Sequence, residues 1–261
     1  MVTEAAFLSA RDLAFRAGGR LLLGPVKLDV APGLVHAVIG HNGSGKSTLL
    51  KLLARQLAPT AGEVRLEGSP VARLGARAFA RRVAYLPQDP PTRTGLTVRE
   101  LAEHGRFPWH GALGRIGATD RDAVTAALAA TRLIPFADRM VDALSGGERQ
   151  RAWIAMLIAQ GADALLLDEP TSALDLAHQI DVLGTLRGLA RSRAAAVVLV
   201  LHDINMAARF CDRITALRNG AVVADGPPGA IMRPEVLEEV YGLPMAVLGR
   251  DGDGPLLGIP A

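Results

Sequence analysis

The chain has 261 residues, enough for one large α/β domain with its own hydrophobic core. Hydrophobic residues make up 49% of it, but the longest apolar runs are strand-sized, far short of the roughly 18 residues that would cross a bilayer. The net charge is +3 and there is no long basic cluster, which argues against nucleic acid as a partner. The single Cys211 excludes an internal disulfide and suits a reducing cytoplasm. We expect no secretory signal.

The first 70 residues alternate short apolar runs with turns, which predicts an antiparallel β subdomain. Three runs that are apolar at almost every position, at residues 35–39, 164–167 and 196–201, are typical of parallel strands covered on both faces. We expect these three runs to form the core sheet.

Between Gln88 and Ser145 the pattern becomes helical, at residues 98–105 and 121–131, around a Gly-rich, aromatic stretch at 106–115. We interpret residues 89–160 as a helical subdomain inserted into a core made of residues 1–88 and 161–248.

Turn and helix signals also mark the last part of the chain. Asn219-Gly220 between apolar runs predicts a tight hairpin, and residues 234–241 predict a short helix. The Gly-rich tail at 249–261 has no periodic pattern, and we expect it to be loosely held.

Residues 40–47 read Gly-His-Asn-Gly-Ser-Gly-Lys-Ser between a predicted strand and a predicted helix, the context of a phosphate-binding loop. Glycines let backbone N–H groups converge on phosphates, Lys46 places its charge at the β and γ phosphates, and Ser47 offers a hydroxyl to Mg²⁺. A Gly-rich turn before an ordinary helix is the alternative, and the complete motif with both flanks favours the nucleotide loop. The predicted ATP contacts here are Gly40, His41, Asn42, Gly43, Ser44, Gly45, Lys46, Ser47 and Thr48.

Asp168-Glu169 follows the strand predicted at 164–167, so both carboxylates emerge at the carboxyl edge of the sheet, where open α/β sheets bind ligands. We expect Asp168 to hold Mg²⁺ through water and Glu169 to polarise the attacking water, a contribution of roughly 10² to 10⁴ in rate. An Asp-Glu-Pro turn that simply ends a strand is the alternative. The phosphate loop on the same chain favours the catalytic interpretation.

Residues 144–150 read Leu-Ser-Gly-Gly-Glu-Arg-Gln and contain a capping box that opens a helix predicted to end at Gln160. A well-capped helix and nothing more is the structural alternative. Two glycines after the cap favour a bound anion instead, because each costs roughly 1 kcal/mol relative to alanine within a helix and an uncovered helix N-terminus attracts anions. The predicted members of this second phosphate-binding surface are Ser145, Gly146, Gly147 and Glu148.

Four further residues have both a functional and a structural interpretation. Gln88 lies at the start of the helical insert, where it can reach Mg²⁺ or the attacking water, although a surface glutamine is the default. His202 ends a strand beside the one that carries Asp168 if the crossover is right-handed, and it can bond the γ phosphate or cap a carbonyl. Asp175 can bridge subunits or start a helix, and Phe15 can stack on adenine or lie in the core.

Taken in this order, the motifs resemble those of the nucleotide-binding subunit of an ABC transporter, over about residues 7–248. The matching segments are the Walker A motif at 40–47, the Q-loop at Gln88, the signature at 144–150, the Walker B motif at 165–169, the D-loop at 172–175 and the switch histidine at His202. Phe15 stands where an adenine-stacking aromatic residue, more often tyrosine, is usual.

The resemblance implies an α/β fold of the P-loop NTPase class: a single ABC-type ATPase domain with a mixed core sheet, an antiparallel β subdomain and a helical subdomain. It also implies an ATPase that uses ATP and Mg²⁺. The metal-binding groups would be Ser47, Gln88 and Asp168, and the catalytic groups Glu169, His202, Gln88 and Lys46.

In that family, two copies form a head-to-tail sandwich in which each ATP lies between the phosphate loop of one chain and the signature of the other. The residues that would contact ATP in trans are Ser145, Gly146, Gly147, Glu148 and Asp175. The resemblance implies that closing the sandwich moves the helical insert and drives a membrane permease. We expect the permease to contact the groove near Gln88 and residues 107–110.

Segments at 80–88, 106–115, 147–156 and 201–208 resemble the ATPase of bacterial ferric hydroxamate (ferrichrome) uptake systems, with heme and cobalamin importers as alternatives. The resemblance implies a peripheral protein on the cytoplasmic face of the bacterial inner membrane, working with a permease and, indirectly, with a periplasmic or lipoprotein siderophore-binding protein. A soluble ABC protein of DNA repair or the ribosome would need a coiled-coil insert or a second cassette, and neither is in the sequence.

Overall fold

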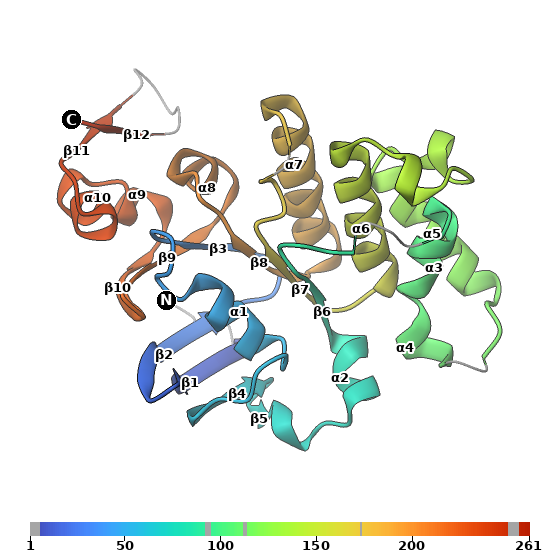
Figure 1. Ribbon diagram of the computed structural model, residues 1–261, viewed down its shortest axis with the longest axis horizontal. Coiled ribbons are helices and arrows are strands. Elements are labelled where there is room, and N and C mark those ends of the chain that lie inside the picture. The colour runs from blue at the N-terminus through green and yellow to red at the C-terminus, as the bar shows by residue number, and fades with distance from the viewer. Residues whose placement is uncertain (1–5, 92–94, 112–113, 173, 250–255) are drawn as a thin grey trace.

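Two β-sheets and the helices packed on them make up the chain, whose structure is a computed structural model that describes residues 6–91, 95–111, 114–172, 174–249 and 256–261 (Figure 1). The core sheet has the strand order β10-β9-β3-β8-β7-β6. Its strands are β3 (Val35–Ile39), β6 (Val83–Leu86), β7 (Ala164–Asp168), β8 (Ala196–Val200), β9 (Arg213–Arg218) and β10 (Ala221–Gly226). Neighbouring strands pair in parallel except β9 and β10, which form the hairpin predicted at Asn219-Gly220.

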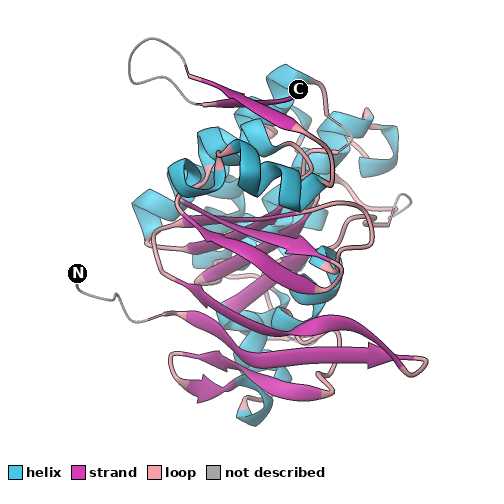
Figure 2. Cartoon of the chain, turned by 90° about the vertical axis from the view of Figure 1, so that its left-hand side faces the viewer, coloured by secondary structure: helices cyan, strands magenta, loops and turns pink. Residues whose placement is uncertain are grey.

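The second sheet is antiparallel and lies beneath the core sheet in Figure 2. Its order is β2-β1-β4-β5, with β1 (Leu8–Ala17), β2 (Arg20–Val30), β4 (Ala61–Leu66) and β5 (Ser69–Pro70). Strand β2 contains two short apolar runs, at residues 21–23 and 26–30, separated by Gly24 and Pro25. The antiparallel β subdomain predicted for the first 70 residues is therefore present.

Each face of the core sheet packs into a different hydrophobic core, which explains why its strands are apolar at nearly every position. Val197 and Leu199 of β8 face one core, together with α6 (Gly146–Gln160) and α7 (Leu176–Arg193). Val198 and Val200 of the same strand face the other core, which contains α1 (Lys46–Leu53) and the antiparallel sheet. The sheet thus separates α6 and α7 on one side from α1 and the antiparallel sheet on the other.

The helices that follow β6 gather beyond the β6 edge of the core sheet, on the right of Figure 1. They are α3 (Val98–His104), α4 (Phe107–His110), α5 (Ala118–Ala130) and α6, with two short 3-10 turns, η2 (Ile134–Phe136) and η3 (Val141–Ala143). Helix α5 begins three residues before the predicted start because Asp120 accepts a hydrogen bond from the Gly117 N–H. Of the stretch at 106–115, residues 112–113 lie outside the described residues.

Between the antiparallel sheet and β6 lie η1 (Val71–Arg73) and α2 (Ala76–Arg82). After the core sheet come α8 (Ile204–Phe210), α9 (Pro228–Ile231) and α10 (Pro234–Tyr241), the last of which is the predicted short helix. Among the described residues, none of the helices combines the length and the apolar character that crossing a membrane requires.

The C-terminal residues form a small hairpin, so the expectation of a loosely held tail is wrong for the described residues 256–261. Strand β12 (Leu257–Pro260) pairs antiparallel with β11 (Met245–Leu248), and the Ala261 N–H donates to the Pro244 carbonyl at 3.0 Å. The physical reason is Gly258, which lets β12 lie directly against α8 and α10. Residues 250–255 lie outside the described part of the chain.

Candidate functional site

A cavity of about 530 Å³ opens where the phosphate loop meets the carboxyl ends of β7 and β8. This is the edge at which open α/β sheets bind their ligands. The residues that line it are Leu22, Asn42, Gly43, Gly45, Lys46, Ser47, Thr48, Gln88, Glu169 and His202. All except Leu22 are site residues predicted from the sequence, so the fold brings together groups that lie far apart along the chain.

Backbone geometry explains two glycines of the phosphate loop. Gly40 has a φ of 144°, and a Cβ there would lie 2.1 Å from the Leu217 carbonyl oxygen. Gly45, the residue before α1, has a φ of 104° in the left-handed region that favours glycine. Because both positions require glycine, the loop curls tightly into the N-terminus of α1. Such a turn aims backbone N–H groups at a bound anion.

Lys46 is buried at the first position of α1 and folds back on its own loop. Its Nζ donates to the Gly40 carbonyl at 2.9 Å and to the His41 carbonyl at 3.0 Å. Burial lowers the pKa of the Lys46 ammonium, and the carboxylates of Glu169 and Asp168 partly offset that effect. The ammonium is thus held inside the loop, bonded to neutral carbonyl oxygens that an anionic ligand would outcompete.

Asp168 ends β7 and is almost fully buried beside the phosphate loop. The Ser47 hydroxyl donates to its Oδ1 at 3.1 Å, across 121 residues of sequence. Burial raises the pKa of the Asp168 carboxyl, and the hydrogen bond from Ser47 opposes that rise. A hydroxyl and a carboxylate oxygen are ligands that Mg²⁺ prefers, so this pair fits the predicted metal.

The carboxylate of Glu169 is held between two side chains from other strand ends. Gln88 Nε2 donates to Glu169 Oε2 at 2.8 Å, and His202 Nε2 lies 2.6 Å from Glu169 Oε1. His202 follows β8, which pairs with β7 as predicted by the crossover rule. Glu169 itself has a φ of +52°, which is rare for a residue other than glycine. Backbone strain of this kind is concentrated at functional sites, because the surrounding structure must hold it in place.

Ser145 opens α6 with the capping box predicted from the sequence. Its hydroxyl accepts from the Glu148 N–H at 3.3 Å, and Glu148 Oε2 accepts from the Ser145 N–H at 2.9 Å. These hydrogen bonds lower the pKa of Glu148. Ser145 and Gly146 are exposed, and neither lines the cavity at the phosphate loop. The two predicted phosphate-binding surfaces of the described chain therefore do not meet.

Comparisons with known proteins decide the family of this chain. The sequence profile of the family described as ABC transporter matches residues 23–172. FhuC of Bacillus subtilis (strain 168), an iron(3+)-hydroxamate import ATP-binding protein, is 41% identical over 234 residues, which cover 90% of this chain and 87% of FhuC. The chain belongs to the ABC transporter family.

Another relative in the ABC transporter family is named for a different substrate. HmuV of Streptomyces coelicolor, a hemin import ATP-binding protein, is 44% identical over 252 residues, which cover 97% of this chain and 89% of HmuV.

Solved structures of ABC transporters share the architecture. A transporter assigned to the metal-chelate type, in an inward-facing conformation, is similar with a TM-score of 0.85 and 28% identity, covering 98% of both chains. The dimeric structure of MJ0796, a bacterial ABC transporter cassette, gives 0.74 and 28%, covering 85% of this chain and 98% of that one. The predicted fold class is confirmed, and the chain is an ABC ATPase, which hydrolyses ATP for transport.

An unpartnered hydroxyl supports the fit of a phosphate to the Walker A loop. Within the described part of the chain, the buried Ser44 Oγ has no hydrogen-bond partner, although the Ser44 carbonyl accepts from the Gly220 N–H at 3.0 Å. Buried hydroxyls are normally satisfied. A phosphate oxygen in the loop would supply the missing partner, so the residues present fit the predicted nucleotide.

Two predicted ABC site residues have structural roles in this conformation. Asp175 is the N-cap of α7: its Oδ1 accepts from the His178 N–H at 2.9 Å and lies 2.7 Å from His178 Nδ1. The adjacent D-loop residue 173 lies outside the described residues. Phe15 is partly buried against the hydrophobic core that lies between the antiparallel sheet and the core sheet, and it does not line the described cavity. Its stacking on adenine stays a prediction.

Sequence reasoning missed the residues that brace the phosphate loop from outside. Leu22 lines the cavity, and its carbonyl oxygen would lie 3.2 Å from a Cβ on Gly45. The Gly220 carbonyl accepts from the Gly24 N–H at 2.7 Å, which fixes β2 to the β9–β10 turn. Only Asn219-Gly220 carried a signal, and that signal indicated a hairpin rather than a contact with the loop.

Proposed function

We propose that this ABC ATPase is the energy-coupling subunit of an importer for iron(III)-hydroxamate siderophores. The observation that carries the catalytic part is the Glu169 carboxylate, held between Gln88 and His202 in the same cavity as Lys46. The similarity to FhuC over 90% of the chain supports the substrate class. The similarity to HmuV supports a second candidate, heme import, with the same catalytic role.

In the proposed reaction, Glu169 is the general base toward the attacking water. Its two carboxylate oxygens each hold one contact, from Gln88 and from His202, and the remaining lone pairs are free to accept a proton from water. His202 would donate to the γ phosphate, and Lys46 would leave the loop carbonyls to bind the β and γ phosphates. Ser47, Asp168 and Gln88 would hold Mg²⁺, whose charge would offset the negative charge of the phosphate oxygens.

We further propose that the working unit is a pair of copies. The exposed N-terminus of α6 at Ser145 lies apart from the cavity of its own chain, as a head-to-tail sandwich requires. Ser145, Gly146, Gly147, Glu148 and Asp175 would then reach the ATP of the second copy.

We assign residues 89–160 as the unit that transmits closure to a permease. Phe107 is 55% exposed and Trp109 is 38% exposed, which is unusual for large apolar side chains and typical of an interface. The permease would contact this segment and the groove near Gln88, with the chain peripheral on the cytoplasmic face of the bacterial inner membrane. A periplasmic or lipoprotein binding protein would deliver the siderophore from the other side.

Uptake in cells tests the substrate. A strain deleted for this gene should lose accumulation of a ferric hydroxamate, and expression of the wild-type chain should restore it. The matched control is Glu169→Gln, which keeps the fold and should not restore uptake. Loss of heme uptake with normal hydroxamate uptake would replace the first candidate with the second.

Mixed pairs test the sandwich, in a background of Glu169→Gln so that ATP is retained. A chain with Lys46→Ala and a chain with Ser145→Arg should each fail to retain ATP alone. In a mixed pair, the intact loop of one chain faces the intact signature of the other, so the mixture should retain one ATP per pair. No retention in the mixture would mean that loop and signature act within one chain.

A further inference from the structure

The C-terminal hairpin is fastened to the first turn of α8, which begins two residues after His202. Asn205 Nδ2 donates to the Gly258 carbonyl at 3.1 Å, and the Gly258 N–H donates back to Asn205 Oδ1 at 2.8 Å. The side-chain amide of Asn205 therefore pairs with the backbone of β12 as a neighbouring strand would. This two-way contact joins positions 53 residues apart.

Close packing at Gly258 supports the same contact. A Cβ at Gly258 would lie 2.9 Å from Leu237 Cδ1 and 3.6 Å from Ile204 Cγ2. Leu237 belongs to α10 and is fully buried, and Ile204 is the first residue of α8. The absence of a side chain thus lets β12 rest on both helices, and Ile204 lies two residues after His202.

Helix α8 is short, and its first turn is held by core packing of Ile204 and Met206, by its N-cap and by the C-terminal strand. The helix has seven residues, fewer than an isolated helix needs to be stable in water. Its N-cap is Asp203, whose Oδ1 accepts from the Asn205 N–H at 2.7 Å and from the Met206 N–H at 3.2 Å. Asn205 is therefore bonded to the cap through its backbone and to the C-terminal strand through its side chain.

His202 depends on this turn for its direction. It lies between the end of β8 and the Asp203 cap, its side chain is 46% exposed, and its described polar contact is the one with Glu169. A histidine so open to solvent is oriented mainly by the backbone on either side of it. We propose that Asn205 and the C-terminal strand are positioning elements that hold His202 toward Glu169 and the γ phosphate. The inference rests on the catalytic role proposed for His202.

Steady-state ATP hydrolysis by the full chain tests the inference, with Asn205→Ala and with a chain that ends at residue 255. Both changes should lower kcat by about tenfold, because an ångström-scale misplacement of a catalytic group costs up to about 10²-fold. The KM for ATP should stay the same, because the Walker A loop follows β3, whereas His202 follows β8. Ile259→Ala is the matched control: Ile259 is exposed on the opposite face of β12 from Gly258, and this variant should keep the wild-type kcat.

A His202→Ala background separates positioning from general damage to the fold. If the strand acts through His202, Asn205→Ala should lower kcat no further in that background. An equal fall with and without His202, or a wild-type kcat in Asn205→Ala, would overturn the inference. If His202→Ala itself leaves kcat unchanged, the role proposed for His202 has failed instead. Asn205→Ala keeps the test decisive if the shortened chain does not fold.

Discussion

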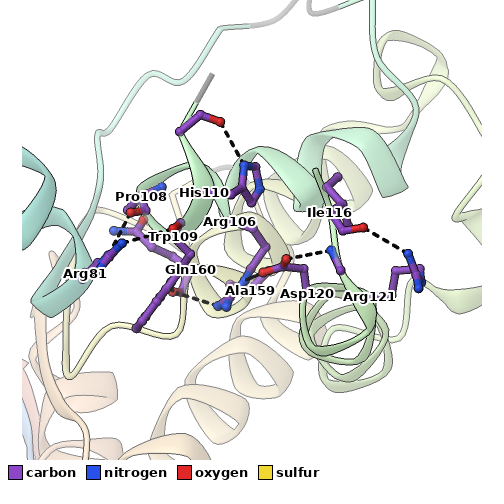
Figure 3. Close-up of polar contacts among 12 residues, drawn as sticks. Arg81, Arg106, Pro108, Trp109, His110, Ile116, Asp120, Arg121, Ala159 and Gln160 are labelled. Carbon is purple, nitrogen blue, oxygen red and sulfur yellow. Dashed lines mark hydrogen bonds and ion pairs between the residues drawn. The ribbon is translucent and has the colours of Figure 1, made fainter. Parts of the chain in front are cut away.

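The nucleotide cavity and the junction between α2 and α4, the second of which is drawn in Figure 3, are both rich in charge, yet they satisfy that charge differently. At the junction, Arg81 donates to the carbonyls of Pro108 and Trp109, at 2.9 and 3.1 Å. Arg77 donates to the same two carbonyls at 2.7 Å each. Two carbonyls of α4, those of Pro108 and Trp109, are thus bonded by arginines of α2.

Trp109 and Arg106 complete the junction. The guanidinium groups of Arg81 and Arg106 lie 5.1 and 4.9 Å from the Trp109 ring, within the range of cation–π attraction. Arg106 also donates to Asp120 at 2.8 Å and to the Ala159 carbonyl at 2.9 Å, and the Trp109 indole donates to the Gln160 carbonyl at 2.7 Å (Figure 3). Every one of these groups finds its partner within the chain.

At the phosphate loop and the cavity, by contrast, Lys46 bonds to carbonyls of its own loop, the buried Ser44 hydroxyl has no described partner, and Glu169 adopts a strained backbone. The arginine and tryptophan groups of the junction are satisfied within the chain, although His110 Nε2 of α4 is buried with no partner among the described residues, whereas the cavity holds groups that a ligand would pair. We therefore expect substitutions in the cavity to change activity and substitutions at the junction to change stability.

The largest effect should come from Glu169→Gln in the cavity. The amide cannot accept a proton from water, so steady-state hydrolysis should fall by roughly 10²- to 10⁴-fold. ATP binding should persist, and the ATP-bound pair should accumulate, measured by ATP titration and size-exclusion chromatography. Wild-type turnover in this variant would contradict the role given to Glu169.

Next in size is Arg106→Ala at the junction. The Arg106 and Asp120 side chains are 10% and 15% exposed, so the change leaves a carboxylate in a largely buried place. Breaking such a pair costs about 3 to 5 kcal/mol of unfolding free energy. Denaturant titration measures the loss, and Arg106→Lys is the control that keeps the charge but not the fork of hydrogen bonds. Equal stability of wild type and Arg106→Ala would show that the junction is not a stabilising cluster.

A second closed cluster, around His36 in β3, predicts a dependence on pH. His36 Nε2 lies 2.7 Å from Thr215 Oγ1 and 3.8 Å from Asp225, which is paired with Arg213. Burial lowers the pKa of His36 to about 4, and the Asp225 carboxylate opposes that shift in part. Between pH 6.5 and 4 the unfolded chain binds a proton that the folded chain does not, so stability falls as pH falls.

For His36 the loss should reach about 3 kcal/mol at pH 4. The measurement is the unfolding free energy against pH for wild type and His36→Gln. The difference between the two slopes removes the contribution of carboxylates that titrate in the same range. Parallel slopes would mean that His36 does not stay neutral in the fold.

Lys46→Ala tests the cavity through binding rather than turnover. A charge-assisted hydrogen bond to a ligand contributes about 1.5 to 3 kcal/mol, so ATP should bind roughly 10- to 100-fold more weakly. The unfolding free energy should change less than the affinity for ATP, because the hydrogen bonds of Lys46 are to two carbonyls of its own loop. An unchanged ATP titration would refute the assignment of the loop.

The smallest effect should come from Trp109→Phe, which removes the hydrogen bond to Gln160 and weakens the stacking with both arginines. We expect the unfolding free energy to drop by about 1 kcal/mol. Thermal or denaturant unfolding detects this change, and Phe107→Leu is a control on the same helix. A stability loss as large as that of Arg106→Ala would show that the indole, not the ion pair, holds the junction.

The sequence predicted the parts of the site that local rules determine. Gly40 and Gly45 stand where the backbone requires glycine, Asp168 follows an apolar strand, and Ser145 begins a capping box, so each was visible within a short window. The adjacency of His202 to Glu169 followed from the crossover rule for parallel strands.

The contacts that sequence reasoning missed join distant segments through flexible side chains. Arg81 to Trp109, Arg106 to Gln160 and Asn205 to Gly258 have no periodic or motif signal, because an arginine or asparagine on a helix surface can choose among many partners. The tail was misjudged for the same reason: a Gly-rich segment is typical of a loop unless a packed surface elsewhere in the chain accepts it.

The two separate cores on either side of the core sheet have a consequence for how this chain can vary. Val197 and Val198 are neighbours on β8 but belong to different cores. A change in the volume of either side chain is therefore accommodated by its own core, and the two cores consist of different residues. Effects of substitutions on opposite faces should therefore add, whereas those on one face should couple.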